Sequence, residues 1–248
     1  MGFCGEDIAL LREMCIRDRF IDELKTLCRQ GGIEAGQDVL ERMEEYYECM
    51  KETNRLYNLT AITEPKEAAL KHFFDSIVPE GEIPGKSRVV DVGSGAGFPV
   101  VPLKILRGDI SAFAVESSKK KCDFIVQGAQ AAGIDVTVMN VRAEELATGK
   151  PRESYDVCVS RAVAQLRVLM ELCAPLLKDG GRFLAYKGDY EKELNEAAGA
   201  MKALNLKLDK VIDMPGGELA HHVLVFHKTG MIAQKYPRRY AQIVKSPL

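Results

Sequence analysis

The chain has 248 residues, of which 46% are hydrophobic and 28% are charged, and its formal net charge is -2 at pH 7. This composition is typical of globular proteins and excludes disordered, collagen-like and disulfide-scaffold chains. No apolar run approaches the roughly 20 residues that span a bilayer, and charged residues interrupt the first 13 positions, so we expect a cytoplasmic protein without membrane contact. The seven cysteines are scattered without a C-x-x-C pair or a histidine at ligand spacing, which predicts reduced thiols and no metal site.

Three amphipathic helices are predicted in the first third of the chain. Apolar side chains recur at helical spacing over residues 6–30 and 37–54, and two adjacent glycines separate these stretches. A third helix is expected over Lys66–Ile77, with Thr63 as its N-terminal cap and Pro65 in its first turn. Together these helices predict an N-terminal helical extension.

From residue 88 onward, short β-rich runs alternate with stretches of helical length and periodicity. Such alternation predicts a mainly parallel sheet with helices on both faces and right-handed crossovers. A Pro215-Gly216-Gly217 turn joins the last two runs, which predicts a hairpin and therefore an antiparallel edge. The predicted strands are Val89–Val92, Ser111–Val115, Val136–Val141, Tyr155–Val159, Arg182–Tyr186, Leu206–Met214 and His222–His227, and the predicted helices between them are 118–132, 164–177 and 190–204.

Parallel strands followed by a terminal hairpin are typical of class I methyltransferases, whereas the dehydrogenase core is purely parallel. We therefore predict an α/β fold of the Rossmann-like, class I methyltransferase kind. It has a seven-stranded, mainly parallel sheet, a C-terminal antiparallel hairpin and an N-terminal helical extension. The extension is expected over residues 1–80, packed on a core domain over residues 81–248 that ends in a basic tail.

The strongest motif is the glycine-rich segment VVDVGSGAGFP, which follows the first predicted strand and leads into an apolar, helix-like stretch. Gly93, Gly95 and Gly97 permit positive φ and leave no Cβ in the way of a ligand. The dinucleotide fingerprint G-x-G-x-x-G is incomplete, because Phe98 follows Gly97 and a third spaced glycine is missing. A ligand without phosphates, such as S-adenosylmethionine, therefore fits better, and a tight turn without any ligand is the alternative.

Carboxylates recur at the carboxyl ends of the first three predicted strands. Asp91 is placed to bind the ammonium group of S-adenosylmethionine, directly or through water. Glu116 lies about 20 residues past the glycine turn, where this fold places an acceptor for two ribose hydroxyls. Glu144 and Glu145 follow the third strand, where methyltransferases of this fold hold the adenine amino group, although acidic residues also favour the start of a helix. Taken together, the three positions favour a cofactor site.

Short motifs along nearly the whole chain identify a family resemblance. They are Asn58–Ile62, Lys71–Ser76, Asp91–Pro99, Glu116–Lys120, Arg142–Glu144, Ser160–Ala162, Lys187–Gly188, Lys235–Arg239 and Lys245–Leu248. With these motifs the chain resembles the RsmG (GidB) family of ribosomal RNA guanine-N7 methyltransferases. The resemblance implies methylation of N7 of guanine 527 (ribosomal numbering) in 16S rRNA of the small ribosomal subunit. We expect a monomer that uses S-adenosylmethionine and no metal.

The resemblance also implies particular cofactor contacts, and the glycine turn adds two more. The expected cofactor-binding residues are Gly93, Gly95, Gly97, Phe98, Glu116, Ala143, Glu144 and Arg161. For Arg161, a structural ion pair is the alternative. Two positions depart from the family pattern: Val100 replaces a usual glycine, and Arg239-Tyr-Ala-Gln-Ile stands where the family usually has a glycine and a proline. The valine affects how the helix after the glycine turn starts. The altered tail affects the contacts that the tail makes with RNA.

The sequence lacks the Asn-Pro-Pro-Tyr box of exocyclic amine methylation and the cysteine signature of pyrimidine C5 methylation. Guanine N7 carries a lone pair and no proton, so its methylation needs no general base, and we predict no catalytic residue. Catalysis then rests on alignment at roughly 3 to 3.5 Å and on exclusion of water. His72, Asp75 and Ser76 are candidates for the substrate pocket, and local helix packing explains them equally well.

Cations that hold RNA phosphates are the last group of predicted contacts. Lys187 follows the fifth strand and is either a phosphate ligand or a solvated lysine. Residues 229–248 contain no Asp or Glu and carry Arg238, Arg239 and Lys245, which predicts either a phosphate-binding tail or a frayed, solvated terminus.

Three other functions agree with parts of the sequence. They are a small-molecule methyltransferase on the same fold, a nucleotide-dependent dehydrogenase, and a non-enzymatic scaffold that kept the cofactor fold. The incomplete glycine motif and the terminal hairpin disfavour the dehydrogenase. The family-like tail and the Lys71–Ser76 segment argue against the small-molecule enzyme.

Overall fold

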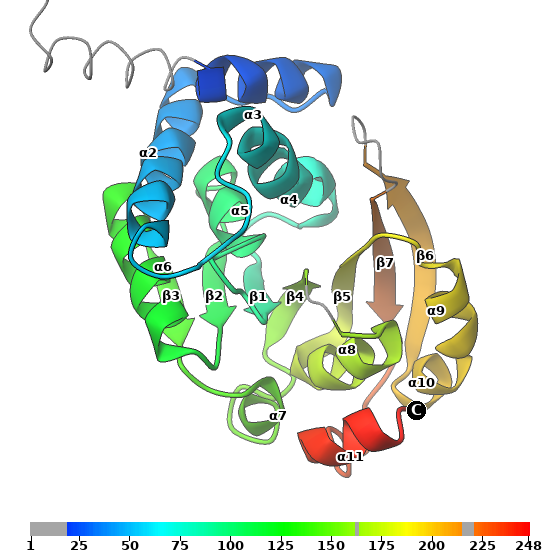
Figure 1. Cartoon of the computed structure of the whole chain (residues 1–248). Helices are drawn as coiled ribbons and strands as arrows, with labels where there is room; N and C mark the ends of the chain where they lie inside the picture. Colours follow the sequence, from blue (N-terminus) through cyan, green and yellow to red (C-terminus); the bar gives the residue numbers. More distant parts are fainter. Residues whose placement is uncertain (1–18, 162–163, 215–220) are drawn as a thin grey trace, which may run out of the picture.

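The computed structural model describes residues 19–161, 164–214 and 221–248, and its centre is a twisted sheet between two layers of helices (Figure 1). Seven strands are hydrogen-bonded in the order β3-β2-β1-β4-β5-β7-β6. The pairs among β1 to β5 are parallel, and β7 is antiparallel to both of its neighbours. The strands are β1 (Arg88–Val92), β2 (Ser111–Val115), β3 (Val136–Met139), β4 (Tyr155–Ser160), β5 (Leu177–Lys187), β6 (Leu206–Asp213) and β7 (His222–Lys228).

The predicted C-terminal hairpin is confirmed, with one change in its placement. β7 is inserted between β5 and β6, so the edge strand β6 runs in the same direction as β1 to β5 and the antiparallel strand lies inside the sheet. β5 begins at Leu177, earlier than the predicted Arg182, because it includes an irregular segment that pairs with β4. The predicted turn at residues 215–217 lies outside the described residues.

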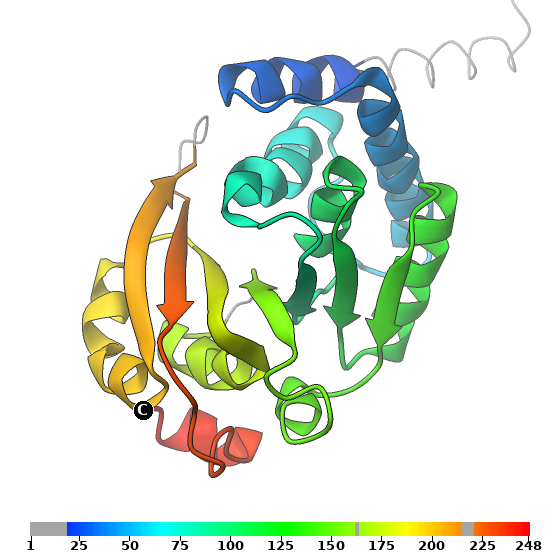
Figure 2. The same cartoon turned by 180° about the vertical axis from the view of Figure 1, so that it is seen from behind.

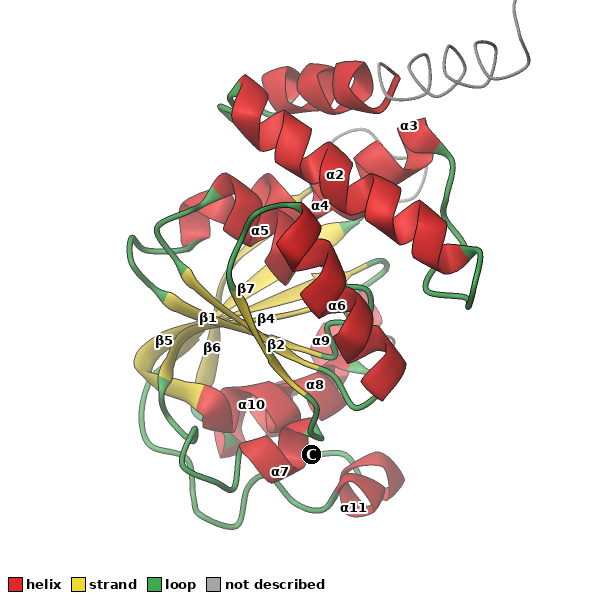
Figure 3. Cartoon of the chain, turned by 90° about the vertical axis from the view of Figure 1, so that its left-hand side faces the viewer, coloured by secondary structure: helices red, strands yellow, loops and turns green. Residues whose placement is uncertain are grey.

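Helices cover both faces of the sheet (Figures 1 and 2). α2, α4, α5 and α6 lie on one side, and α7, α8, α10 and α11 on the other (Figure 3). No helix in the described ranges is long and apolar enough to cross a membrane. Apart from the helical residues 19–30, these elements are α2 (Gln37–Asn54), α3 (Pro65–Ala68), the π-helical turn η1 (Ala69–Phe74), α4 (Asp75–Ile77), the 3-10 turn η2 (Val78–Glu82), α5 (Val100–Leu106), α6 (Lys119–Ala131), α7 (Ala143–Leu146), α8 (Leu166–Cys173), η3 (Ala174–Leu176), α9 (Glu191–Glu196), α10 (Ala198–Ala203) and α11 (Tyr240–Lys245).

Side chains of β1 alternate between the two hydrophobic layers, as the pleat of a strand requires. Val90 and Val92 pack with α8 and α10, whereas Val89 packs on the opposite face with Leu103 of α5. Both faces of the strand are therefore buried, which explains its continuous apolar sequence. Val92, at the carboxyl end of β1, lines a cavity.

The N-terminal helices are confirmed within the described residues, and the predicted residues 6–18 of the first helix lie outside them. The third helix begins at Pro65, one residue earlier than predicted, and its cap is Glu64 in place of the predicted Thr63. The Glu64 side chain accepts from the backbone N–H of Glu67 at 3.0 Å. Aromatic side chains carry the packing of this extension: Phe20 stacks on Tyr47 with ring centroids 4.5 Å apart. The same hydrophobic cluster includes α5 and α6, so the extension and the sheet share one core.

The basic tail is packed and is not frayed. The Arg238 guanidinium donates to both carboxylate oxygens of Glu171 on α8, at 2.8 and 2.6 Å, and its backbone N–H donates to the same carboxylate at 2.9 Å. Glu171 is fully buried, so this arginine compensates the cost of burying a carboxylate. Ile243 of α11 is fully buried in the layer that contains α8. Arg238, which we predicted to bind phosphate, therefore has a structural partner.

We predict that Arg238→Ala lowers the free energy of unfolding by about 2 to 4 kcal/mol, because it leaves the buried Glu171 carboxylate without its cation. Arg239→Ala, at the exposed neighbouring position, should change it by less than about 0.5 kcal/mol. Urea unfolding of the two variants checks this. Equal stability of both variants would contradict a structural role for Arg238.

Candidate active site

The turn between β1 and α5 presents bare backbone to a cavity at the carboxyl end of the sheet. Gly93 and Gly95 line this cavity with φ of 77° and 58°, in the left-handed region that favours glycine. A Cβ on Gly95 would meet only the Gly93 carbonyl oxygen, at 4.0 Å, so the conformation and not crowding requires glycine here. A ligand can thus lie directly against the turn.

The first cavity has a volume of about 460 Å³. Glu116 is one of its two carboxylates and is held by two backbone N–H groups, from Gly95 at 3.0 Å and Ser118 at 2.8 Å. Each carboxylate oxygen can accept more than one hydrogen bond, so Glu116 remains able to bind hydroxyl groups while fixed in place. The lining residues are Val92, Gly93, Gly95, Val115, Glu116, Ser117, Lys121, Val141, Arg142, Ala143, Glu144, Arg161, Ala164, Leu169, Leu172 and Tyr240.

The groups of this cavity fit S-adenosylmethionine. The glycine turn leaves room for a ligand without phosphates, Glu116 offers acceptors for ribose hydroxyls, and Ala143 and Glu144 lie where the adenine contacts are predicted. The remaining wall is largely apolar, which suits a partly buried organic ligand.

Gly97 and Phe98, which we predicted to contact the cofactor, lie outside the lining of the first cavity and pack on the helical extension. A Cβ on Gly97 would collide with the hydroxyl of Tyr46, which donates to the Ala96 carbonyl at 3.0 Å. The Phe98 ring stacks on His72 with centroids 4.6 Å apart. In this structure, Gly97 therefore allows the close approach of α2 to the turn.

Val100, at a usual glycine position of the family, lies on the helix side of the turn. Its side chain is fully buried in the cluster that joins α5 to the N-terminal helices. Its backbone N–H donates to Asp91 Oδ2 at 3.4 Å. Because Val100 is not part of the lining of the first cavity, the substitution leaves that cavity open.

Asp91 is fully buried and does not line the first cavity. In this position its carboxyl group cannot bond directly to an ammonium group in that cavity. Burial raises the pKa of this carboxyl to about 8, although the neighbouring Val100 N–H and Arg161 oppose the shift. Within the described residues, its Oδ1 has no hydrogen-bond partner. The fold thus holds a destabilising buried acid directly beneath the glycine turn.

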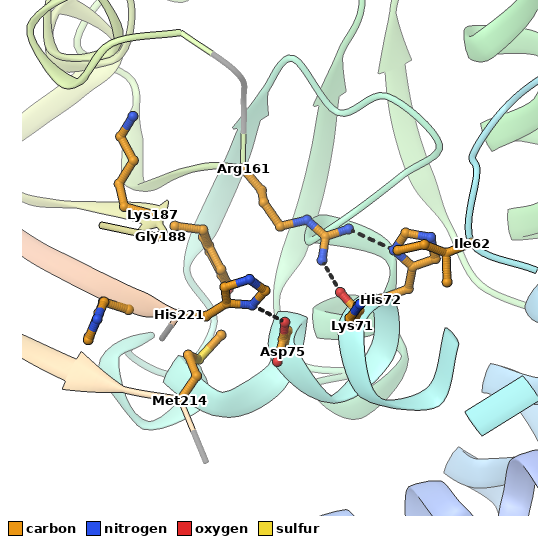
Figure 4. Close-up of a pocket in the computed structure, with 11 residues that line it drawn as sticks. Ile62, Lys71, His72, Asp75, Arg161, Lys187, Gly188, Met214 and His221 are labelled. Carbon is orange, nitrogen blue, oxygen red and sulfur yellow. Dashed lines mark hydrogen bonds and ion pairs between the residues drawn. The ribbon is translucent and has the colours of Figure 1, made fainter. Parts of the chain in front are cut away.

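Arg161, directly after β4, lines both the first cavity and a second one. Figure 4 shows its place in the second cavity. Its Nη1 donates to the Lys71 carbonyl at 2.7 Å, and its Nη2 lies 3.3 Å from His72 Nδ1. The guanidinium carbon also lies 5.3 Å from the centre of the Phe98 ring. Within the described residues, these contacts are a carbonyl, an imidazole and an aromatic face, and no carboxylate lies at ion-pair distance from the guanidinium.

The second cavity has a volume of about 400 Å³ and lies between the third predicted helix and the ends of β5 and β7. Its polar wall combines histidines, a carboxylate and cations, and its apolar wall comes from Ile62, Tyr186 and Met214. The full lining is Ile62, Lys71, His72, Asp75, Arg161, Tyr186, Lys187, Gly188, Met214, His221 and His222.

His72 is neutral in this cavity. Burial, together with Arg161 and Lys71, lowers the pKa of the imidazole to about 3. A guanidinium only donates, so Nδ1 is the acceptor and Nε2–H donates to Thr60 Oγ1 at 2.8 Å. The ring is thereby held in one tautomer.

Asp75 faces the second cavity from the helical segment and is bound by His221 Nδ1 at 3.0 Å (Figure 4). Burial raises the pKa of the Asp75 carboxyl. His221 was not predicted from the sequence. Three of the four histidines of the chain line this one cavity, but only the folded chain brings them together.

Other predicted substrate residues lie in different surroundings. The Ser76 hydroxyl is buried and donates to the His72 carbonyl within its own helix. Lys187 lines the second cavity, but its ammonium group donates to the Ala164 carbonyl at 2.8 Å and pairs with Glu193 at 2.7 Å. Arg239 and Lys245 are exposed on and beside α11.

We predict that Asp91→Asn raises Tm, and that the increase grows as the pH rises from 4 to 8. Because burial raises the pKa of Asp91 from 3.8 to about 8, the folded protein holds a proton that the unfolded chain has lost in this range. The aspartate therefore lowers stability progressively as the pH rises, and asparagine does not. Thermal unfolding across this pH range measures the difference.

Asp109→Asn is the matched control, for which we expect a change in Tm of the opposite sign. Arg107 holds the pKa of Asp109 at about 2, so this aspartate contributes stability above the unfolded pKa, which is lost on acidification. Its replacement should lower Tm at neutral pH, and the deficit should shrink at low pH. A Tm change for Asp91→Asn that did not depend on pH would contradict the raised pKa.

Comparison with known proteins gives one consistent family. A family model described as rRNA small subunit methyltransferase G matches residues 39–221. A protein named Ribosomal RNA small subunit methyltransferase G from Thermoanaerobacter sp. (strain X514) is 36% identical over 240 residues, covering 94% of this chain and 100% of the relative. One of the same name from Staphylococcus epidermidis (strain ATCC 35984) is 38% identical over 234 residues, covering 92% of this chain and 98% of the relative.

Solved structures support the fold at much lower identity. A ribosomal protein L11 methylase from Lactobacillus delbrueckii subsp. bulgaricus superposes with a TM-score of 0.52 at 16% identity, covering 69% of this chain and 90% of the other. A putative transferase from Pyrococcus horikoshii superposes with a TM-score of 0.53 at 13% identity, covering 63% of each chain. At such identity the likeness is one of fold alone.

Proposed function

The chain belongs to the rRNA small subunit methyltransferase G family, and on this premise we propose that it transfers a methyl group from S-adenosylmethionine to N7 of a guanine in 16S rRNA. The substrate in this proposal is the small ribosomal subunit in the cytoplasm. The observation that carries the proposal is the pair of cavities that meet at Arg161. A cofactor in the first cavity and a base in the second would lie on either side of one side chain.

The first cavity is the proposed cofactor site, and bound S-adenosylmethionine supplies an electrophilic methyl group on its sulfonium. The backbone of Gly93 and Gly95 forms the floor for the amino-acid end. Glu116 accepts from the ribose hydroxyls, and its two backbone bonds hold it ready before the ligand arrives. Ala143 and Glu144 bind the adenine edge. These contacts orient the cofactor without proton transfer.

The second cavity is the proposed guanine pocket. Guanine presents N1–H and a 2-amino group side by side, and a carboxylate can accept from both. Asp75 is the carboxylate of this cavity, and His221, the residue before β7, holds it. Ile62, Tyr186 and Met214 supply apolar walls that exclude water around the base.

Electrostatics in the second cavity suit a reaction in which the purine becomes positively charged. N7 attacks through its lone pair, so the chain needs no general base. Because the pKa of His72 is about 3, its imidazole stays neutral and adds no cation beside the purine. The Asp75 carboxylate lies close enough to Arg161 to offset part of the charge of its guanidinium.

Contacts to RNA phosphates are proposed for the exposed cations Arg239 and Lys245, with Lys120 in addition. Its neighbours differ, because Lys119 pairs with Asp123 and Lys121 lines the first cavity. Arg238 and Lys187 are left out of this proposal, because carboxylates already bind their charged groups. Phosphate contacts of this kind position the RNA without reading its sequence.

Methyl transfer from labelled S-adenosylmethionine to small ribosomal subunits that lack their N7-methylguanine tests the function directly. We expect label on a single guanine, located by chemical cleavage at N7-methylated sites. The double variant Arg239→Glu, Lys245→Glu should transfer more slowly at unchanged cofactor affinity, since charge reversal weakens phosphate binding. Cofactor binding with no label on any ribosomal particle would overturn the RNA substrate and favour a small-molecule enzyme.

Asp75→Asn tests the guanine pocket. The amide would place a donor against the two guanine donors, so we expect kcat/KM for ribosomal particles to fall about tenfold to a hundredfold. The dissociation constant of S-adenosylmethionine, measured by calorimetry, should stay unchanged. Asp213→Asn is the matched control, because that carboxylate is 86% exposed and lies outside the cavity lining. Equal activity of the two variants would exclude a role for Asp75 in binding the base.

A further inference from the structure

Residues 232–248, here called the C-terminal segment, are fastened to the core at several points. Arg152 donates to the Tyr236 carbonyl at 2.6 Å, and Glu171 of α8 binds the Arg238 guanidinium. Ile243 of α11 is fully buried. The segment therefore has a defined position, and its side chains meet defined neighbours.

Tyr240, the first residue of α11, lines the first cavity. Among the described residues of that lining, it is the only aromatic one. Its side chain is 40% exposed, so the ring is neither part of the core nor free in solvent. Leu169 and Leu172, one turn apart on α8, line the cavity as well. The ring and the two leucines give the cavity an apolar, partly open wall.

This wall belongs to the adenine end of the first cavity. Ala143 and Glu144, the proposed adenine contacts, open α7. α7, α8 and α11 gather at the same end of the molecule in both views (Figures 1 and 3). The glycine turn that faces the amino-acid end belongs instead to the start of α5.

We propose that Tyr240 is a further cofactor-binding residue, whose ring packs against the adenine of S-adenosylmethionine. The inference rests on the proposed function of the first cavity as the cofactor site. Adenine is the one flat aromatic part of that molecule, and aromatic side chains stack on bases irrespective of base identity. Arg238 then acts as a positioning residue, because its bond to Glu171 places α11, and with it Tyr240, at the cavity.

Calorimetric titration of the full chain with two ligands tests this proposal. One ligand is S-adenosylmethionine, and the other is 5′-methylthioadenosine, which keeps the adenosine and lacks the amino-acid head. Tyr240→Ala and Tyr240→Leu should weaken both ligands by a similar factor of about five to twenty, because both substitutions remove the flat ring. Tyr240→Phe, which keeps the ring, should stay within about twofold of the wild type.

Val244→Ala is the matched control, since Val244 lies one turn further along α11, is 51% exposed and is not part of the cavity lining. It should leave both affinities unchanged. Thermal unfolding of each unliganded variant shows whether α11 keeps its place, and Tyr240→Leu keeps apolar volume if alanine destabilises the segment.

The outcomes separate this inference from the function on which it rests. Weaker binding of S-adenosylmethionine with unchanged binding of methylthioadenosine would place the ring at the amino-acid end and overturn the adenine contact. Unchanged affinity for both ligands with slower transfer to ribosomal particles would make Tyr240 an RNA contact and would likewise overturn the proposal. Absence of S-adenosylmethionine binding by the wild type would overturn the proposed function and this assignment with it.

Discussion

The guanidinium of Arg161 is the contact on which the site depends. It reaches from the end of β4 to the backbone of Lys71 and the ring of His72, and it covers the face of Phe98. One side chain thereby joins the sheet, the glycine turn and the helical extension. It also forms a wall shared by the two cavities, so the proposed cofactor and base would be aligned by the same group that connects these parts of the fold.

The polar groups around Arg161 lower the stability of the fold and are better explained by a functional role. Asp91 is buried with an oxygen that has no partner in the described residues, and His72 is kept neutral by burial. Uncompensated polar groups of this kind are rare in protein interiors and gather at functional sites. Tyr46 of α2 and Phe73 of η1 pack edge-on against Phe98, and this aromatic packing stabilises the glycine turn that contains Phe98. The helical extension thus supports the cofactor turn in addition to supplying the second cavity.

The C-terminal segment contains structural and exposed basic residues, and the charge pattern of the sequence does not distinguish between them. Arg238 neutralises a buried carboxylate on α8, while Arg239 and Lys245 remain exposed. A single run of basic residues therefore contains one structural cation next to others that are available for RNA. The same anchoring brings Tyr240 to the first cavity, so the end of the chain contributes to the proposed cofactor site as well as to the surface.

Local patterns in the sequence were sufficient to predict the sheet, its hairpin, the glycine turn and the carboxylate Glu116, because strand periodicity and left-handed glycines are properties of neighbouring residues. The partners of Arg238 and Asp75 were not predictable in this way. Glu171 lies 67 residues from Arg238, and His221 lies 146 residues from Asp75. Such pairs are decided only when helices and strands pack, since burial selects which charged groups must meet, and a contact between distant segments leaves no periodic signal in the chain.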